Sequence, residues 1–537
     1  MENLLLDIDL AAVDWARAQF ALTAIYHWLF VPLTLGLAVI MGVAETVYWR
    51  TRDEFWKTAA KFWQRLFGVN FAIGVATGII LEFQFGTNWS NYSWFVGDIF
   101  GAPLAVEGIV AFFMESTFVA VMFFGWNKVS RGFHLASTWL TGIGATISAW
   151  WILVANAWMQ YPVGCEFNPD TMRNEMASFA EVALSPMGVN KFFHAVTSSW
   201  IIGALFVMAV SCWYLLKKRH GRLALTGIKM ASVLGLVASL LAMHSGDGSA
   251  YQVAQRQPMK LAAMEALYSG GKSQDLTCIA MVNPLSQPDY ENEAEPPMKI
   301  AIPGALSLLG TRTMDGYVPG VRDILDGGYK QADGTVALSV EQKMERGRRA
   351  IANLKEYRGM AASGGGMTEK TGGMAAAKTG GKADASRMEK LRKELAEDMP
   401  YFGYGYVRDR AQVVPFIPVC FWSFRVMVGL GTLFLVFFIV MAVLAFRKDV
   451  SRYKWLLWSG IALLPLGYIA SEAGWIVAEL GRQPWTIQDM LPTWAGVSGV
   501  GSGSVMLTFF IFLVLFTVLL AVEINIMLKQ IKKGPEL

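Results

Sequence analysis

The sequence predicts an all-α polytopic membrane protein with nine transmembrane helices and a large extracytoplasmic loop between helices 6 and 7. Composition is the first observation behind this prediction: 54% of the 537 residues are apolar, only 16% are charged, and the mean hydropathy is +0.38. The second is that nine apolar runs are long enough to cross about 30 Å of hydrocarbon, which takes about twenty helical residues. Such a chain is neither a cytosolic enzyme nor a disordered scaffold.

Each predicted span is an apolar run bounded by polar residues. The nine runs lie near residues 21–46, 66–85, 103–125, 134–159, 191–216, 223–244, 415–446, 455–478 and 505–528. The segment that precedes the first run, residues 1–20, is acidic where a signal peptide would be basic, so we expect no cleavage there. We interpret this segment as an amphipathic helix on the membrane surface.

Lysine and arginine are distributed unevenly between alternate connections, and this predicts the orientation. The basic set comprises Arg50, Arg52, Lys57, Lys61, Lys128, Arg131, Lys217, Lys218, Arg219, Arg222, Arg447, Lys448, Arg452, Lys454, Lys529, Lys532 and Lys533. The connection 86–102 has no basic residue, and Arg173 and Arg482 stand alone in 160–190 and 479–504. Because basic residues are retained in the cytoplasm, we expect the N-terminus outside and the C-terminus inside.

This topology divides the chain into three parts. Residues 1–245 form a six-helix membrane part, residues 246–414 a polar extracytoplasmic segment, and residues 415–537 a three-helix membrane part. The polar segment holds a low-complexity insert, about residues 359–385, that is too rich in Gly, Ala and Lys to bury a core. On either side of it, KLAAMEALY and MEKLRKELAEDM have helical composition. No internal repeat is visible, so an inverted-repeat transporter is not favoured.

The histidines are candidate functional residues, because a titratable side chain inside a span is costly. His27 and His194 lie within apolar runs among aromatic neighbours, which suits axial haem ligands. A hydrogen-bonded structural histidine is the alternative for both. His134 and His220 lie at span ends beside basic residues, and His244 lies where the sixth span ends. We expect these three to be structural.

Two carboxylates of the third span are a second candidate site. Glu107 opens the span, and Glu115 follows eight residues later. On an α-helix this spacing places Glu115 about 12 Å deeper and roughly 80° further round. The two side chains are therefore able to line one polar path that runs inward.

Two further stretches combine polar groups with apolar sequence at the outer side. Met427 lies in the seventh span at a depth close to that of His194, and Arg425 precedes it by two residues. A methionine in a span is usually packing, but His with Met is also a known axial haem pair. The string SEAGWIVAELGRQPW joins Glu479 at the end of the eighth span to Arg482 and a Pro-Trp pair. An aromatic-belt turn with a snorkelling arginine is its simplest reading.

Residue counts exclude several other classes. The four cysteines are scattered and form no C-x-x-C pair, which argues against zinc, iron–sulfur clusters and covalent haem c. Five isolated histidines are too few for a haem–copper oxidase or a two-haem cytochrome b bundle. The 46 basic residues are nearly balanced by 42 acidic ones, so the net charge does not indicate a nucleic-acid-binding protein.

Five motifs together resemble subunit I of the cytochrome bd-type quinol oxidases. They are QFALTAIYHWLFVPLTLG, GDIFGAPLAVEGIVAFFMEST, WILVANAWMQ, KLAAMEA and GWIVAELGRQPW. The resemblance covers nearly all spans in order, and only the low-complexity insert has no counterpart. It implies a terminal oxidase of the bacterial cytoplasmic (inner) membrane. Such an enzyme would take electrons from quinol at the outer face, reduce dioxygen to water and generate proton motive force without pumping.

The resemblance also implies three haems and their protein ligands. His194 and Met427 would bind a low-spin haem b that receives electrons from quinol. His27 and Glu479 would be axial ligands to two high-spin haems, a haem b and either a haem d or a third haem b. The haem cluster would be held by propionate pairing and packing through Arg425, Trp475 and Arg482.

The remaining implied roles concern protons and quinol. Glu107 would lie beside the oxygen-reducing haem, and Glu115 with Ser116 would help to conduct protons from the cytoplasm. Lys260 and Glu265 in KLAAMEA would belong to the quinol site of the outer loop. They are five residues apart, about 140° around a helix, so they need not act on the same quinol atom, and solvated loop charges are the alternative.

The resemblance also implies partner subunits, and two other functions are alternatives to it. The resemblance implies a second membrane subunit, in some relatives a small single-span accessory subunit, and contact with membrane lipid. A proton-coupled or ion transporter without haem is the first alternative, with the buried carboxylates as its pathway. A non-catalytic assembly or quinone-binding subunit is the second.

Overall fold

The computed structural model describes residues 9–293, 295–363, 382–447 and 449–535. Most of the low-complexity insert, residues 364–381, lies outside the described residues. Within them, nine helical stretches are long and apolar enough to cross a membrane, as the sequence predicts. These are α1 (Leu10–Thr51), α2 (Glu54–Thr87), α4–η2–α5 (Gly97–Val106, Glu107–Phe112 and Phe113–Phe124), α6 (Arg131–Gln160), α8 (Pro186–Leu216), α9 (Gly221–Arg256), α15 (Ile417–Arg447), α16 (Lys454–Leu480) and α18 (Ser502–Lys533).

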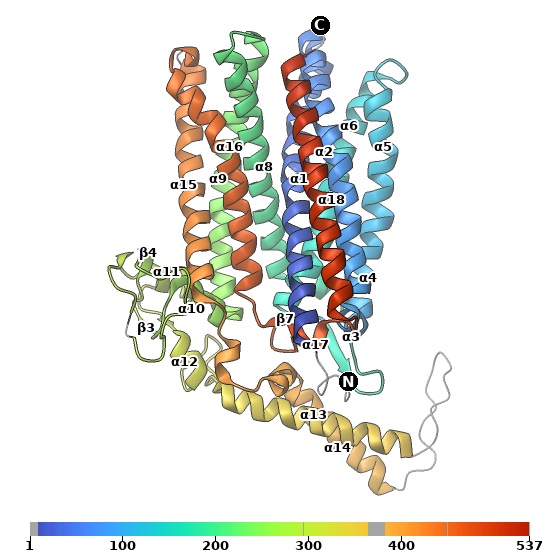
Figure 1. The fold of residues 1–537 in the computed structure, drawn as a ribbon, viewed down its shortest axis with the longest axis vertical. Coiled ribbons are helices and arrows are strands. Elements are labelled where there is room, and N and C mark those ends of the chain that lie inside the picture. Colours follow the sequence, from blue (N-terminus) through green and yellow to red (C-terminus); the bar gives the residue numbers. More distant parts are fainter. Residues whose placement is uncertain (1–8, 294, 364–381, 448, 536–537) are drawn as a thin grey trace.

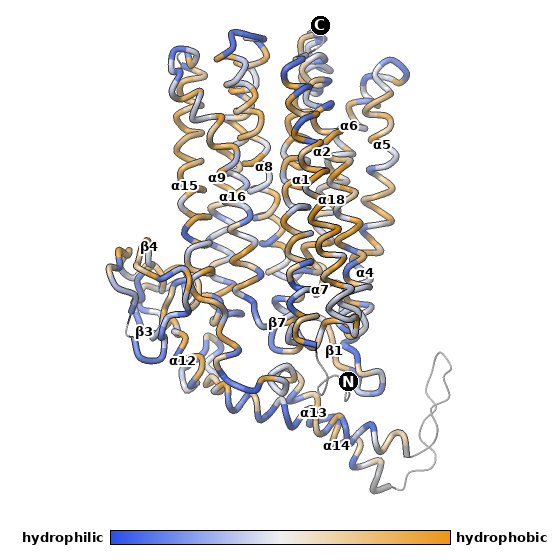
Figure 2. The backbone as a smooth tube through the Cα atoms, viewed as in Figure 1, coloured by the Kyte–Doolittle hydropathy of each residue, from blue (hydrophilic) through white to orange (hydrophobic). Residues whose placement is uncertain are grey.

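These helices stand side by side in one bundle whose polar residues gather at its two ends (Figure 1, Figure 2). Helix α1 packs against α2, α6, α8 and α18, while α8, α9, α15 and α16 form a second packed group. The described N-terminal residues and the segment between α9 and α15 lie at one end, called here the loop end, and the C-terminus lies at the opposite end (Figure 1).

Short elements connect the spans. The helical ones are α3 (Ser90–Phe95), α7 (Phe179–Ala183), α10 (Pro258–Glu265), α11 (Ala305–Thr311), α12 (Val321–Asp326), α13 (Val340–Ser363), α14 (Lys382–Asp398), η3 (Met399–Tyr406), η4 (Arg410–Val413), η5 (Val450–Arg452) and α17 (Thr493–Gly496). The strands form antiparallel pairs: β1 (Cys165–Asn168) with β2 (Arg173–Met176), β3 (Gly271–Lys272) with β6 (Tyr317–Val318), β4 (Leu276–Ile279) with β5 (Ile300–Ile302), and β7 (Trp485–Ile487) with β8 (Leu491–Pro492).

The prediction of a separate surface helix before the first span is wrong for residues 9–20, and residues 1–8 lie outside the described residues. Helix α1 begins at Leu10 and runs unbroken into the span, and the side chain of Asp9 caps it by accepting hydrogen bonds from two backbone amides of its first turn. The amphipathic pattern is real, because Asp14 is exposed while Ala16 is fully buried. It belongs to the first turns of the spanning helix itself, at the loop end of the bundle.

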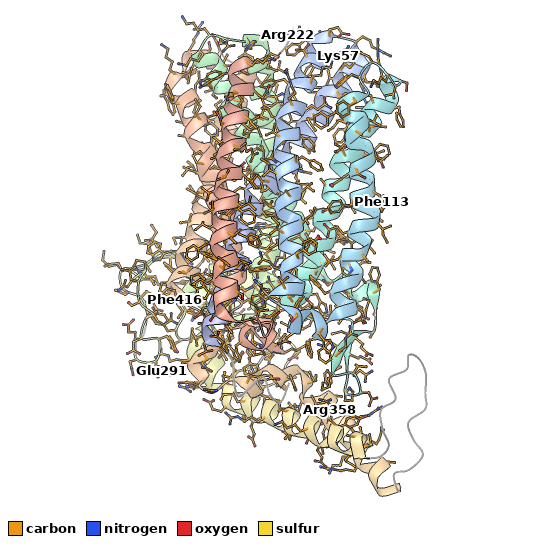
Figure 3. The ribbon with its side chains drawn as sticks, turned by 45° about the vertical axis from the view of Figure 1, so that its right-hand side comes forward. Lys57, Phe113, Arg222, Glu291, Arg358 and Phe416 are labelled. Carbon is orange, nitrogen blue, oxygen red and sulfur yellow. The ribbon has the colours of Figure 1, made fainter. Side chains whose placement is uncertain are left out.

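The loop end is built around paired charges. Asp398, with 1% of its side chain exposed, accepts hydrogen bonds from Arg346 at 2.6 Å and Arg349 at 2.5 Å, which ties α13 to the end of α14. These two guanidinium groups hold the pKa of Asp398 below its ordinary value, although burial opposes them. Figure 3 shows Arg358 on α13 at this end and Lys57 and Arg222 at the opposite end.

Helices α1 and α8 approach each other at a pair of glycines. A Cβ atom added to Gly203 would overlap the backbone of Gly36, and one added to Gly36 would overlap Gly203. The two backbones are therefore in direct contact at this crossing, as small residues allow in membrane helices. Because α1 carries His27 and α8 carries His194, this contact fixes the spacing between the two helices that bear the predicted histidine ligands.

We predict that Gly203→Leu destabilises the bundle by about 1–3 kcal/mol, since overpacking forces the two helices apart. The midpoint of thermal unfolding in detergent measures the effect. Gly503→Leu on α18 is the matched control, because a Cβ there meets no atom within 4 Å. Equal midpoints for the two variants would contradict the tight crossing.

Candidate functional site

His194 is oriented by helix α9. Its Nδ1 lies 3.1 Å from the carbonyl oxygen of Ala242 and 3.1 Å from the hydroxyl of Ser245. A carbonyl only accepts, so Nδ1 carries the proton and Nε2 presents a lone pair. Among the described residues, Gly246 lies against the ring, where a Cβ would come within 3.4 Å of Cε1. Metal-binding histidines commonly have their second ring nitrogen held by the protein in this way.

Met427 has a similar neighbour on helix α16. A Cβ added to Gly474 would lie 3.0 Å from the Met427 sulfur. Helices α8, α9, α15 and α16 pack together, so His194 and Met427 belong to one four-helix group. A glycine therefore packs directly against each of the two side chains.

His27 is held on α1 by helix α2. Its Nδ1 lies 3.0 Å from the hydroxyl of Thr77, and a Cβ on Gly78 would lie 3.0 Å from its Cε1. The adjacent residue, Trp28, packs edge-to-face on Trp475 of α16 with ring centroids 5.0 Å apart. The aromatic pair connects α1 to the helix that carries Glu479.

Glu479 is the centre of a buried polar network. Its carboxylate accepts hydrogen bonds from Asn156 at 3.1 Å, from Gln160 at 3.3 Å and from Arg482. Lys191 donates to Asn156 and lies 5.4 Å above the ring of Trp475. The anion is therefore fixed by two amides of α6 and by a guanidinium group from the segment that follows α16.

Lys260 joins this network from α10. Its ammonium group donates to Gln160, to Gln257 and to the carbonyl of Ala478, each at 2.9 Å. Burial lowers the pKa of Lys260 well below its ordinary value, as does the nearby positive charge of Lys191. The predicted quinol residue thus lies within two hydrogen bonds of Glu479.

Glu265, at the other end of α10, faces a different neighbour. It pairs with Arg425 at 2.7 Å, and Arg425 also donates to the carbonyls of Met264 and Thr277. Burial raises the pKa of Glu265 above its ordinary value against the opposing charge of Arg425. The two predicted quinol residues therefore point to two separate clusters, Lys260 to that of Glu479 and Glu265 to that of Arg425.

Glu107 and Glu115 lie on the same side of the third span, which corrects the expected offset of 80°. Residues Glu107–Phe112 form the π-helix η2, in which each residue turns through less than the 100° of an α-helix. Both carboxylates consequently face α6: Glu107 accepts a hydrogen bond from Ser148 at 2.6 Å, and a Cβ on Gly144 would lie 2.9 Å from Glu115. Only 6% and 7% of the two residues are exposed.

The structure separates Ser116 from this pair. Its side chain is exposed and donates to the carbonyl of Phe113, whereas Glu115 is buried. His134, expected to be structural, bonds through both ring nitrogens, to Glu45 at 2.6 Å and to the carbonyl of Met122 at 3.0 Å. It has no nitrogen left for a metal.

Sequence reasoning missed four residues that hold the site together: Lys191, Asn156, Gln160 and Ser148. Lys191 lies three residues before His194, where a lysine is usually read as a snorkelling flank. Asn156 and Gln160 are four residues apart in an apolar span, so they share one helix face. That spacing of two amides was the available signal.

The fold and these clusters define a multi-pass helical membrane protein with several buried polar clusters near one end of its bundle. The chain matches the family of cytochrome bd terminal oxidase subunit I over residues 15–535. It therefore belongs to this family.

Relatives extend over nearly the whole chain. The chain is 41% identical over 526 residues to the cytochrome bd-II ubiquinol oxidase subunit 1 of Escherichia coli K12, covering 97% of both chains. It is 34% identical over 523 residues to the cytochrome bd ubiquinol oxidase subunit 1 of Bacillus subtilis 168, covering 97% of this chain and 94% of the relative. The bd oxidase structure from Geobacillus thermodenitrificans matches the fold with a TM-score of 0.75 at 21% identity, covering 98% of this chain and all of that one.

Proposed function

We propose that this chain is the haem-bearing subunit of a quinol oxidase that takes electrons from quinol at the outer membrane face and reduces dioxygen to water. Its protons come from the cytoplasm, so charge is separated without a pump. The observation that carries the proposal is that His27 and His194 each have Nδ1 held by a neighbouring helix and a glycine against the ring. Family membership and the 41% identity to a ubiquinol oxidase subunit support it.

The residues present fit the haems that the family implies. His194 and Met427 would hold the low-spin haem b from opposite helices of one group, and Arg425 would pair with its propionates. His27 and Glu479 would hold the two high-spin haems, a haem b and a haem d or third haem b, and Trp475 and Arg482 would help to bind them. A haem with one free axial position supplies oxygen binding, and one with two protein ligands supplies electron transfer only.

The carboxylates of the third span would move protons toward the site of oxygen reduction. Glu115 is the inner of the two, and the π-helix places Glu107 on the same side of the helix, nearer the loop end. The second oxygen of Glu107, Oε2, is buried and has no hydrogen-bond partner among the described residues. This oxygen is therefore available to accept a proton from a water molecule. Ser116 would contribute only from the exposed face.

Quinol would be oxidised at the loop end, beside α10. Lys260 would position one quinol oxygen and Glu265 would accept a proton from the other, since the two side chains point to different clusters. Both lie outside the spans, at the end of the bundle that we place on the outer side. Released protons would therefore leave on the outer side.

The topology and partners complete the proposal. The N-terminus would lie outside and the C-terminus in the cytoplasm, in a bacterial inner membrane. Large apolar side chains such as Val514 and Val518 on α18 remain exposed, which leaves surface for lipid, a second membrane subunit and a small single-span accessory subunit.

The test is the reduced-minus-oxidised absorption spectrum of the purified complex, with extraction of the haems and a measurement of quinol-driven oxygen consumption. We expect haem b bands and a red chlorin band, and oxygen uptake that depends on quinol. Haem b bands alone would still support a quinol oxidase and would identify its third haem as a haem b. A complex without haem would overturn the proposal and favour a proton-coupled transporter.

A further inference from the structure

A chain of hydrogen bonds leads from Lys260 away from the spans. Lys260 donates to the side-chain oxygen of Gln257 at 2.9 Å, and Gln257 donates to Gln488 at 3.0 Å. Gln488 donates in turn to the carboxylate of Asp489 at 2.9 Å. Asp489 lies in the turn between β7 and β8, so the chain joins α10 to the segment that follows the eighth span.

These side chains surround a cavity of about 50 Å³. A buried water needs roughly 10–15 Å³ of such space, so the cavity has room for a few waters. It is too small for an aromatic ring, since a cavity that binds benzene measures about 150 Å³. Quinol itself is therefore excluded, while a short file of water is accommodated between Lys260 and Asp489.

Asp489 is held in place by its neighbours. Tyr404 of η3 donates to its carboxylate at 3.0 Å, and its backbone carbonyl accepts from Gly403 at 2.9 Å. The positive charge of Lys343 on α13 interacts with the Asp489 carboxylate, and that carboxylate interacts electrostatically with Tyr329. Arg256 and Arg482 line the same cavity, from α9 and from the segment after α16.

Asp489 both lines this cavity and reaches the molecular surface. Asp489 is only partly exposed, and burial raises its pKa above the ordinary aspartate value against the opposing charge of Lys343. A carboxyl group with a raised pKa both accepts and releases protons more readily near neutral pH than an exposed aspartate does.

We propose that Asp489 is a proton-relay residue, which takes up protons that quinol releases beside Lys260 and passes them through water to the outer aqueous phase. This inference rests on the proposed function. Each quinol that becomes a quinone gives up two electrons and two protons. The electrons pass to the enzyme, one proton goes to Glu265, and the proton released beside Lys260 leaves through the cavity water and Asp489. Asp489 ends each cycle ionised, as it began.

The test compares Asp489→Asn with the intact complex. We expect kcat for quinol oxidation to fall about tenfold or more with KM unchanged, because the amide cannot carry a proton. Oxygen uptake driven by a tetra-alkylated phenylenediamine, whose oxidation releases no proton, should stay as in the wild type. Asp489→Glu should restore most of kcat, and Asp315→Asn, at an exposed aspartate, is the matched control.

The pH profile provides an independent readout. Because the relay needs the ionised carboxyl, wild-type kcat should fall as the pH drops through the pKa of Asp489, and this acid limb should be lost in Asp489→Asn. Tyr404→Phe, which removes one hydrogen bond to the carboxylate, should move the limb to higher pH with the haem spectrum unchanged.

Three results would overturn the relay. They are an unchanged kcat in Asp489→Asn, a rise in KM alone, which would make Asp489 a quinol contact, and an equal loss with both electron donors, which would make its role structural. A wild-type complex with no haem and no quinol oxidation would overturn the proposed function itself. A wild-type oxidase whose Asp489→Asn variant is fully active would overturn the relay alone.

Discussion

Replacing His194 with alanine is expected to abolish the low-spin haem signal and to lower quinol-driven oxygen consumption at least about a hundredfold. Loss of a residue that only orients a metal ligand by a hydrogen bond commonly costs about 10–100-fold in metal affinity, so loss of the ligand itself should exceed this. The Nδ1 contacts to Ala242 and Ser245 leave Nε2 as the only ring atom that can bind iron. The reduced-minus-oxidised spectrum and the ratio of haem to protein measure the outcome.

Met427, the proposed second ligand of this haem, is tested in the same way. Met427→Leu keeps the side-chain volume but removes the sulfur, so it should convert the low-spin signal to high-spin or remove it. Two variants are matched controls: Met441→Leu, a fully buried packing residue on the same helix, and His244→Ala, an exposed histidine of α9. A low-spin spectrum that survives both ligand changes would assign the haem to other residues.

Glu107→Gln is expected to lower oxygen reduction by about a hundredfold or more, because the amide cannot pass on a proton. The low-spin haem should still be reduced by quinol, since Glu107 lies on the third span and not in the α8–α9–α15–α16 group. Stopped-flow spectroscopy separates the two steps: fast reduction by quinol, then slow reoxidation by oxygen.

Two further variants test whether slow reoxidation depends on the Glu107 carboxylate itself. Ser148→Ala removes the 2.6 Å hydrogen bond to Glu107 and should slow reoxidation less than the loss of the carboxylate does. Glu181→Gln, an exposed glutamate of α7, is the control for a change of charge alone. Full oxygen reduction by Glu107→Gln would remove this carboxylate from the proton path.

The nine spans were predictable from sequence because each contains about twenty apolar residues, and the membrane admits few other structures. The surface-helix interpretation was wrong for residues 9–20 because an exposed acidic face at the end of a spanning helix gives the same pattern as a helix on the membrane. Asp14 and Ala16 sit on opposite faces in either case.

The site was predictable in its residue types but not in its connections. Sequence spacing gave Glu107 and Glu115 an offset because it assumes 100° per residue, and a π-helix has no sequence signature that would correct the angle. The partners of Glu479 come from α6 and α8, hundreds of residues away, so only the packing of the helices reveals that Asn156, Gln160 and Lys191 converge there.

The network around Glu479 contains more basic than acidic side chains. Lys191, Lys260 and Arg482 surround a single carboxylate in an interior where unbalanced charge costs several kcal/mol. A prosthetic group with acidic edges would supply negative charge here, and its binding would then be thermodynamically linked to the folding of this end of the bundle. Cells starved of such a group should therefore hold less of this chain, because quality control removes a membrane protein whose interior is left electrostatically incomplete.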